Sequence, residues 1–340
     1  MMASSLQPEA GRIKVAIDAM GGDDAPEVVL AGVRQLLESH NPDDQSLYLV
    51  LVGFAEALSS IQSEYPERIE AVACSEVIEM DEHPAMAVKQ KKDSSIVVGC
   101  QLVKQGRADA FFSAGSTGAA MTAATLIIGR IKGIKRPAIA TIIPAPKGPV
   151  VLLDAGANSD VEAEYLLQFA AMGEIFAQGV MGIASPRVGL LNVGAESSKG
   201  SLLAQQAYSL INENVKGFAG NAEGSDIFKG TYDVIVTDGF TGNIVLKTME
   251  GLVSGLFGEI KNIFYASTLN KLAAAVIKKD LTALKNHLDI EIIGGAPLLG
   301  LKAPVVIGHG SSSAVAIANG IRATAAACHQ QIPELIAAAL

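Results

Sequence analysis

The sequence has few charged residues and few cysteines, and both shortages exclude classes of protein. Charged residues occupy 18% of the 340 positions, hydrophobic residues occupy 49%, and the mean hydropathy is positive. These values exclude a disordered tail protein, a coiled coil and a highly charged solenoid. Cys74, Cys100 and Cys328 are odd in number and far apart, so they form neither a disulfide framework nor a CxxC motif. A reducing cytosol fits this cysteine usage best.

Basic residues are scarce as well. The chain has 26 Lys and Arg against 35 Asp and Glu, which gives a formal net charge of −9. It has no long Lys/Arg block and no basic stripe interleaved with aromatic residues that could displace counterions from nucleic-acid phosphates. The sequence therefore predicts no nucleic-acid partner.

Familiar reaction motifs are missing too. The sequence contains no GxSxG elbow, no Walker A motif, no HExxH and no complete GxGxxG. These absences remove the sequence support for a serine triad, for P-loop nucleotide use and for zinc catalysis. The five histidines are not paired at metal-ligand spacing, and the sequence predicts no metal and no cofactor.

Two segments indicate whether the protein is secreted or inserted in a membrane. The first residues lack the charged start and apolar run of a secretory signal, and we expect residues 1–12 to be a disordered extension. Residues 110–129 carry no charge over a length that could span a bilayer. A Gly-Ser-Thr-Gly break interrupts this stretch, so we interpret it as a buried strand, a loop and a buried helix.

Apolar β-branched runs alternate with stretches of helical period along the whole chain, the pattern of βαβ units. The predicted strands are residues 13–20, 47–53, 69–75, 108–114, 138–143, 150–155, 188–193, 215–220, 233–237 and 305–307. The predicted helices are residues 27–39, 56–65, 95–105, 119–128, 162–178, 202–214, 242–265, 269–288 and 313–331. The prediction is an α/β fold, a Rossmann-like three-layer α/β/α sandwich with a mostly parallel sheet. No repeat or linker divides the chain, so we expect a single domain over residues 13–340 with a helical excursion over 242–288.

Six glycine-rich turns follow predicted strands, and each places small or hydroxyl residues at a helix start. They are DAMGGDDAP, SAGSTGA, DAGAN, NVGAESSKG, TDGFTGN and GHGSSSA. Any one of them can be an ordinary helix N-cap. Together they suggest an anion site, because ligands of open α/β sheets bind at the carboxyl ends of strands and helix N-termini offer free N–H groups. The cations near such turns are Lys89, Lys91, Lys92 and Lys199.

Two further features each allow more than one interpretation. Leu269, Leu272 and Val276 fall at helical spacing with lysines nearby, which fits packing at a dimer interface, packing on the sheet, or reversible contact with a membrane surface. The densest basic cluster, GRIKGIKRP, is either an ordinary exposed loop or a patch that steers an acidic partner.

The motifs IDAMGGDDAP, SAGSTGA, SPRVGLLNVGAESSKG, VTDGFTGN, STLNKLAAAV and GLKAPVVIGHGSS, in this order, closely resemble the bacterial phosphate acyltransferases of phospholipid synthesis, the PlsX family. Ser116 and Ala155 stand where that family usually has Asn and Val.

The resemblance implies an acyltransferase that moves a long-chain acyl group from acyl carrier protein to inorganic phosphate and supplies acyl phosphate to a membrane glycerol-3-phosphate acyltransferase. It also implies a fold similar to phosphate acetyltransferase and isocitrate dehydrogenase, a homodimer, and a cytoplasmic location with peripheral contact at the inner face of the cytoplasmic membrane.

For the site, we expect a phosphate cradle formed by Gly115, Ser116, Thr117 and Gly118, with Asn158 and Asn243 as further polar groups. His309 is the candidate proton donor to the leaving thiolate, and Lys199 is the candidate for charge stabilisation. We expect Arg130, Lys132, Lys135 and Arg136 to dock the carrier protein, and Leu269, Leu272 and Val276 to contact membrane. Hydrophobic helices over residues 252–264 and 269–277 could form a groove for the acyl chain.

Two other functions remain open at this point. One is a nicotinamide-dependent hydroxy-acid dehydrogenase, which the missing dinucleotide fingerprint disfavours. The other is a non-catalytic scaffold on the membrane surface that recruits lipid enzymes through residues 269–277.

Overall fold

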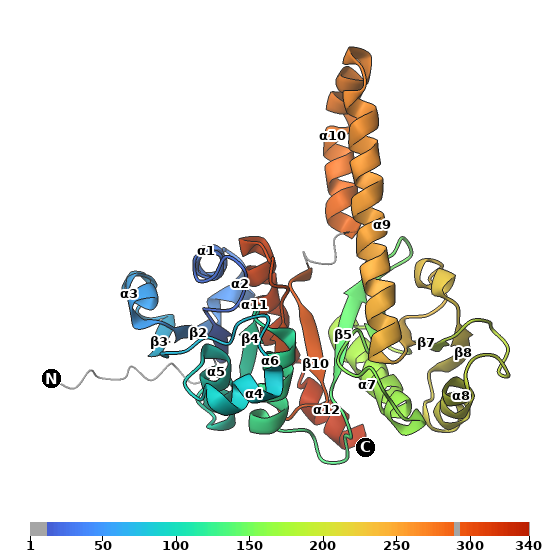
Figure 1. Cartoon of the computed structure of the whole chain (residues 1–340), viewed down its shortest axis with the longest axis horizontal. Helices are drawn as coiled ribbons and strands as arrows, with labels where there is room; N and C mark the ends of the chain where they lie inside the picture. The colour runs from blue at the N-terminus through green and yellow to red at the C-terminus, as the bar shows by residue number, and fades with distance from the viewer. Residues whose placement is uncertain (1–11, 289–292, 340) are drawn as a thin grey trace. The chain divides into compact units, whose positions relative to one another are not determined.

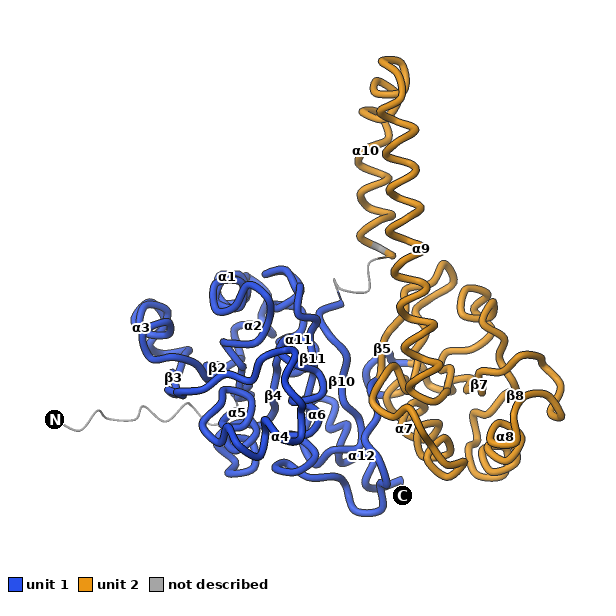
Figure 2. Tube along the Cα trace, viewed as in Figure 1, with its two compact units in different colours: residues 1–139, 179–182, 293–340 blue, residues 140–178, 183–292 orange. Residues whose placement is uncertain are grey.

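The computed structural model describes residues 12–288 and 293–339. Apart from Arg12, the expected N-terminal extension lies outside these residues. The chain divides into two compact units (Figure 2). Unit 1 comprises residues 1–139, 179–182 and 293–340, and unit 2 comprises residues 140–178 and 183–292. One boundary falls between Ile139 and Ala140, inside strand β5 (Ala138–Ile143), so no linker composition marks it in the sequence.

The sheet of unit 1 has the order β3-β2-β1-β4-β11-β10 and then pairs with the first residues of β5. Its strands are β1 (Ile13–Asp18), β2 (Leu47–Gly53), β3 (Ile69–Ala73), β4 (Ala110–Ser113), β10 (Ala296–Leu299) and β11 (Val305–Ile307). All neighbouring pairs from β3 to β11 are parallel, whereas β10 is antiparallel to β11 and to β5. The carboxyl ends of β1, β4 and β11 therefore lie next to one another.

Helices cover both faces of this sheet (Figure 1). They are α1 (Glu27–Leu37), α2 (Pro42–Gln45), α3 (Ala55–Glu64), α4 (Pro84–Gln90), α5 (Ser95–Lys104), α6 (Thr117–Ala123), α11 (Ala314–His329) and α12 (Ile332–Ala339). Phe111 and Phe112 are neighbours in β4, so their side chains point to opposite faces. Phe111 packs against Gly99 of α5 and Phe112 against Gly320 of α11, with no room for a side chain at either glycine. Because one face of β4 packs on α5 and the other on α11, the sheet lies between two layers of helices.

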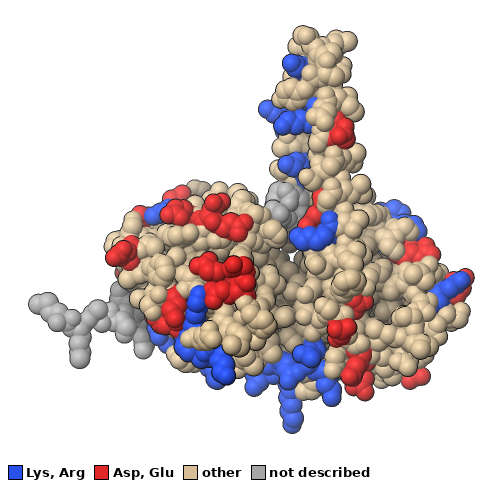
Figure 3. Space-filling view, viewed as in Figure 1, with Lys and Arg blue, Asp and Glu red and all other residues tan. Residues whose placement is uncertain are grey.

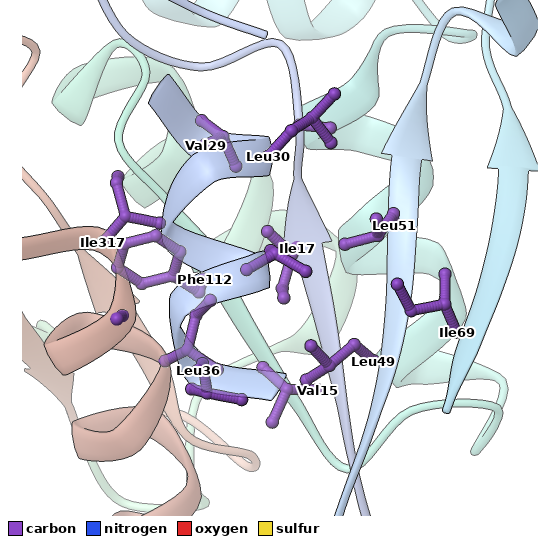
Figure 4. Close-up of a cluster of buried hydrophobic side chains, with 14 of the residues drawn as sticks. Val15, Ile17, Val29, Leu30, Leu36, Leu49, Leu51, Ile69, Phe112 and Ile317 are labelled. Carbon is purple, nitrogen blue, oxygen red and sulfur yellow. The ribbon is translucent and has the colours of Figure 1, made fainter. Parts of the chain in front are cut away.

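The core between the sheet and helices α1 and α11 is made of aliphatic side chains around Phe112 (Figure 4). Val15 and Ile17 of β1 alternate with residues on the other face, and Val29 and Leu36 of α1 pack onto them. These side chains are fully buried, and at roughly 1.5–3 kcal/mol for each one their removal from water is the main force that holds α1 on the sheet.

Unit 2 has the strand order β5-β6-β9-β7-β8. After β5 its strands are β6 (Val150–Leu153), β7 (Val188–Leu191), β8 (Phe218–Ala222) and β9 (Val234–Val236), and its helices are α7 (Ala163–Met181, whose last residues belong to unit 1), α8 (Leu202–Asn214), α9 (Gly239–Tyr265) and α10 (Thr268–Leu288). Only the β5–β6 pair is antiparallel. The carboxyl ends of β6, β9 and β7 form a second row of loops.

Helices α9 and α10 form an antiparallel hairpin that extends from the sheet of unit 2 (Figure 1). With 27 residues, α9 is roughly 40 Å long. Leu269, Leu272 and Val276 of α10 are 76%, 64% and 83% exposed. On the face seen in Figure 3 the hairpin is mostly uncharged, with scattered basic and acidic side chains. The predicted excursion over 242–288 is this hairpin.

The structure confirms the predicted α/β class with a mostly parallel sheet. The predicted strand at 215–220 lies slightly later, at Phe218–Ala222. The antiparallel strand β10 and helices α2, α4 and α12 were not predicted, because each is short and contains a proline. Residues 110–129 form a strand, a loop and a helix as expected, and no helix in the described part of the chain is long and apolar enough to cross a membrane.

Candidate active site

Three loops of unit 1 meet at the carboxyl ends of β1, β4 and β11. They are residues 19–26, 114–116 and 308–313. The amide of Asp23 donates to the Gly310 carbonyl at 2.8 Å, and the amide of Gly308 donates to the Ser113 carbonyl at 2.8 Å. Gly22 has a φ of +122°, and a Cβ at this position would lie 3.2 Å from the Gly310 carbonyl oxygen. The sheet order therefore gathers three of the six glycine-rich turns in one place, as expected for an open α/β sheet.

A buried carboxylate, Asp18, lies beneath two of these loops. Its Oδ2 accepts a hydrogen bond from Ser113 Oγ at 2.7 Å, and its Oδ1 accepts one from the Met20 amide at 3.0 Å. Ser113 Oγ in turn accepts the Gly115 amide at 3.1 Å. Burial raises the pKa of Asp18, although hydrogen bonds from Ser95 and Ser113 act in the opposite direction. Asp18 thus ties the loop after β1 to the loop after β4.

The predicted phosphate cradle lies in this loop and the helix that follows it. Ser116 is the N-cap of α6 and accepts the Ala119 amide at 3.4 Å, and α6 continues without a break into the π-helix η1 (Ala124–Ile128). The Gly115 amide is used by Ser113. The first N–H groups of a helix have no acceptor within the helix, so the amides of Thr117 and Gly118 remain for a ligand. Gly118 has no room for a side chain because it packs against Pro84 of α4.

His309 lies in the third loop and is exposed. Its Nδ1 is 2.8 Å from Ser311 Oγ, and its amide donates to Ser312 Oγ at 3.1 Å. The contact with Ser311 orients the ring and leaves Nε2 as the nitrogen that can exchange a proton with a ligand. Lys91, one of the nearby cations, is paired with Glu82 and donates to the Val77 carbonyl, so its charge is already neutralised within unit 1.

In unit 2, Asp154 follows β6 and holds the DAGAN loop. Its Oδ1 accepts the amides of Gly156 and Ala157 at 3.1 and 2.9 Å. Its Oδ2 accepts both the amide and the side-chain nitrogen of Asn158 at 2.8 Å. We expected the Asn158 side chain to contact phosphate. In the structure it donates to the buried Asp154 carboxylate and so helps to fix the conformation of the loop.

Asn243 is the fifth residue of α9 and is exposed. Its side chain is near Gly156 of the DAGAN loop. Asp238 caps α9 by accepting the amide and hydroxyl of Thr241, both at 2.8 Å. A side chain at Gly242 would collide with the Asp154 backbone, so this glycine allows α9 to start directly against that loop. Asn243 thus lies beside the DAGAN loop of unit 2, the loop that contains Asn158.

Lys199 is exposed in the loop between β7 and α8. Its amide donates to the Glu196 carbonyl at 3.0 Å, and Asn192 Nδ2 donates to its carbonyl at 3.1 Å, so the loop backbone is fixed while the ammonium group is in solvent. A cavity of about 300 Å³ lies beside this loop, lined by Asn192, Gly200, Ser201, Asp238 and Thr241 among others.

A larger cavity of about 490 Å³ lies along α9. We call it the hairpin groove, and its apolar lining is Pro144, Phe228, Met249, Leu252, Val253, Phe257 and Leu288. Lys261 and Lys285 also line it. Part of the predicted groove, residues 252–264, is therefore present, whereas residues 269–277 do not line this cavity.

The basic loop, residues 129–137, lies in unit 1. Lys132 and Arg136 are exposed, whereas the Arg130 guanidinium donates to the Lys135 carbonyl and shapes the loop. The loop pairs with residues 300–302, and the Lys302 side chain lies beside Gly129. Lys302 therefore belongs to this basic cluster. Because it is far from residues 129–137 along the chain, the sequence alone does not indicate this.

Sequence reasoning missed Asp18, Ser113 and Asp154 as site residues. A signal was present, since both aspartates lie near the carboxyl end of a predicted strand and are followed by alanine and a glycine-rich turn. Within residues 12–288 and 293–339, no group of three or more His, Cys, Asp or Glu side chains is arranged to hold a metal ion.

Comparisons with solved structures show which proteins share this fold. A phosphotransacetylase from Streptococcus pyogenes matches with a TM-score of 0.63 at 19% identity, covering 94% of this chain and 95% of the other. The EutD phosphotransacetylase of Staphylococcus aureus matches with a TM-score of 0.61 at 18% identity, covering 93% and 94%. At these identities the likeness establishes the fold alone.

Sequence comparisons are more specific. A model of the family described as "Fatty acid synthesis protein" matches residues 13–335. The phosphate acyltransferase of Desulfitobacterium hafniense is 48% identical over 313 residues, 91% of this chain and 92% of the relative. That of Bacillus subtilis is 44% identical over 326 residues, 95% and 97% of the two chains. The match covers every loop described above, and the chain belongs to the phosphate acyltransferase family of fatty acid and phospholipid synthesis.

Proposed function

We propose that this enzyme transfers a long-chain fatty acyl group from acyl carrier protein to inorganic phosphate, reversibly giving acyl phosphate and free carrier protein. The observation that carries the proposal is the loop of residues 115–118, which lies among the loops at the carboxyl ends of β1, β4 and β11. The Thr117 and Gly118 amides at the start of α6 have no acceptor within the helix. Family membership supports phosphate and acyl groups as substrates.

The chemistry needs no nucleophilic side chain. A phosphate oxygen attacks the thioester carbonyl carbon, a C–O bond forms, and the C–S bond breaks as the tetrahedral intermediate collapses. The thiolate then takes a proton. The protein must position phosphate and stabilise the oxyanion, and fixed backbone N–H groups do both without reorganisation.

Individual roles follow from position. The amides of Thr117 and Gly118, with Ser116, would hold the phosphate, and Nε2 of His309 would protonate the leaving thiolate. Within unit 2, Asn243 offers an exposed amide and Lys199 an exposed ammonium group, both able to bind an anionic group. Asn158 would act mainly by fixing the DAGAN loop through Asp154.

The hairpin groove would take the acyl chain. Its volume of about 490 Å³ is within the usual range for ligand sites of about 300–1,000 Å³, and its lining is mostly apolar. The groove begins at Met249, about 9 Å along α9 from Asn243, and reaches Phe257, about 21 Å along the same helix. The part of the groove from Met249 to Phe257 therefore spans about 12 Å along α9.

The groove gives a chain-length prediction. Val253→Phe should fill part of the groove and lower kcat/KM about tenfold for hexadecanoyl but not for octanoyl carrier protein, since each excluded methylene loses about 0.8 kcal/mol. Leu256→Phe, at an exposed position of α9 that does not line the groove, is the matched control. Equal losses for both chain lengths would remove the acyl chain from this groove.

Partners and location belong to the same proposal. The basic loop would dock the acidic carrier protein, and the exposed apolar residues of the hairpin would contact a second copy in a homodimer and the inner face of the cytoplasmic membrane. A cytoplasmic enzyme on this surface would release its acyl phosphate close to a membrane glycerol-3-phosphate acyltransferase.

The test is direct. Purified protein is incubated with palmitoyl carrier protein, with and without inorganic phosphate, and acyl phosphate is trapped as its hydroxamate with hydroxylamine. We expect hydroxamate that depends on phosphate and exceeds a control without enzyme. Absence of product from folded protein over several chain lengths would contradict acyl transfer and would favour a membrane-surface scaffold, which co-sedimentation with liposomes would then reveal.

A further inference from the structure

The Ser113 hydroxyl is the only link in the described chain between the buried Asp18 carboxylate and the Gly115 amide. It donates to Asp18 Oδ2 at 2.7 Å and accepts from Gly115 at 3.1 Å. All three residues are buried, and Asp18 and Ser113 are 95 positions apart in the sequence. We call this chain of hydrogen bonds the Asp18 clasp.

The loop after β1 packs tightly against the clasp. A side chain at Gly21 would lie 2.5 Å from Asp18 Oδ2 and 2.6 Å from the Gly115 amide nitrogen, so the loop after β1 closes directly over the clasp. Asp18 also accepts the Met20 amide from that loop. One carboxylate therefore fixes both loops at the point where the chain enters residues 116–118.

We propose that Asp18 is a positioning residue for phosphate, acting through Ser113 to set the direction of the amides that follow Gly115. The proposal rests on the proposed function, because it takes phosphate as the ligand of those amides. Gly115 itself is a structural member, since its amide is used inside the clasp. Asp18 touches no substrate in this account.

The chemistry of the neighbours explains why a carboxylate is needed. Ser113 and the Met20 amide both present hydrogens to Asp18, so both of its oxygens must accept. In Asp18→Asn one oxygen becomes an NH₂ group of nearly the same size, and a donor then faces a donor. In Ser113→Ala the bridge is removed, and Asp18 and the Gly115 amide each lose a partner.

The test measures KM for phosphate and KM for the acyl donor separately, with thermal unfolding recorded for every variant. We expect Asp18→Asn and Ser113→Ala each to raise KM for phosphate about tenfold, the effect of one lost hydrogen bond, with KM for the acyl donor unchanged. Because both substitutions act through the same clasp, the double variant should also raise KM for phosphate about tenfold, and not about a hundredfold.

Asp44→Asn is the matched control. Asp44 is an equally buried carboxylate of unit 1, held by Arg322 and not by the loops of the site. It should lose thermal stability and keep its KM for phosphate. An unchanged KM for phosphate in folded Ser113→Ala, an equal rise in both KM values, or fully multiplicative effects in the double variant would overturn the proposal.

Direct binding of inorganic phosphate, measured by calorimetry, separates this proposal from the proposed function. If wild-type protein makes no acyl phosphate but binds phosphate, and Ser113→Ala binds it about tenfold more weakly, the clasp proposal stands while acyl transfer fails. If wild-type protein binds no phosphate, the clasp proposal fails.

Discussion

Asp18 and Asp154 perform the same task in the two units. Asp18 is the last residue of β1, and Asp154 directly follows β6. Each is a fully buried carboxylate and orders the glycine-rich loop that follows by accepting its N–H groups. A buried carboxylate loses its hydrogen bonds to water, and the loop amides replace them only while the loop keeps its shape. Both residues therefore fix the backbone of the loop that follows them. Under the proposed function, this rigidity preorganises the remaining loop donors for a developing oxyanion.

The three cysteines have surroundings that argue against thiol chemistry. Burial, with nearby carboxylates, raises the pKa of Cys74 to about 11 and that of Cys328 to about 12, and burial also raises the pKa of Cys100. A thiol with a raised pKa stays protonated near neutral pH and is a poor nucleophile.

We predict that iodoacetamide at pH 8 leaves the rate of hydroxamate formation unchanged and leaves the folded protein unlabelled, as mass spectrometry would show. The same reagent in urea should modify Cys74, Cys100 and Cys328, which serves as the control. Labelling of one cysteine in step with loss of activity would place a thiol in the reaction.

At the scale of elements, α2 and α11 are joined by a partly buried ion pair. Asp44 is 1% exposed and accepts three hydrogen bonds from the Arg322 guanidinium, at 2.8–3.1 Å. Burial acts to raise the pKa of Asp44, but the hydrogen bonds and charge of Arg322 outweigh it, so the pKa is lowered. A lowered folded-state pKa means that the stabilisation is complete above the ordinary aspartate pKa and is lost as the pH falls through the folded value.

We therefore predict that Asp44→Asn lowers the free energy of unfolding by about 1–3 kcal/mol at pH 7, and that its difference from wild type shrinks below about pH 4. Arg322 is partly exposed, which puts the effect toward the lower end. Urea unfolding at several pH values is the measurement, and Asp43→Asn at the exposed neighbouring position should have almost no effect. A difference that grows toward low pH would contradict this sign.

The hairpin is the second element with a separable role. Leu272 and Val276 expose apolar surface on α10, with Lys271 and Lys278 nearby, a combination that suits a membrane containing anionic lipids. Burying either side chain in lipid contributes roughly 1.5–3 kcal/mol.

We predict that Leu272→Glu or Val276→Glu weakens co-sedimentation with such vesicles at least about tenfold and leaves turnover of soluble acyl carrier protein unchanged. Thr282→Glu adds the same charge at an exposed polar position of α10 and isolates the contribution of charge. Equal losses in all three variants would mean that charge alone, and not apolar contact, governs the binding.

At the scale of the whole molecule, a net charge of −9 opposes an acidic carrier protein, so docking needs a local positive field. Lys132 and Arg136 of the basic loop are exposed, and Lys302 lies beside that loop. At physiological ionic strength charges interact over roughly 8 Å, which favours a short-range patch over the net charge.

We predict that Lys132→Glu with Arg136→Glu raises KM for acyl carrier protein about tenfold at low salt, and by less at high salt. Lys278→Glu with Lys279→Glu changes the net charge equally on helix α10 of unit 2, outside the basic loop, and should leave this KM unchanged. The same KM in both double variants would remove the docking role of the basic loop.

The sequence by itself determined the alternation of strands and helices, the glycine-rich turns, the amphipathic hairpin and the family, because each is written in neighbouring residues or in ordered motifs. It predicted that the glycine-rich turns lie together at the carboxyl ends of the strands, and three of them meet in unit 1.

Only the tertiary structure decided which loop donors are free and which are used. The link from Asp18 through Ser113 to Gly115, the place of Lys302 beside the basic loop and the antiparallel strand β10 all depend on pairings between distant segments. Strand order sets those pairings, and it follows from burial of the whole core, a property that no local pattern contains.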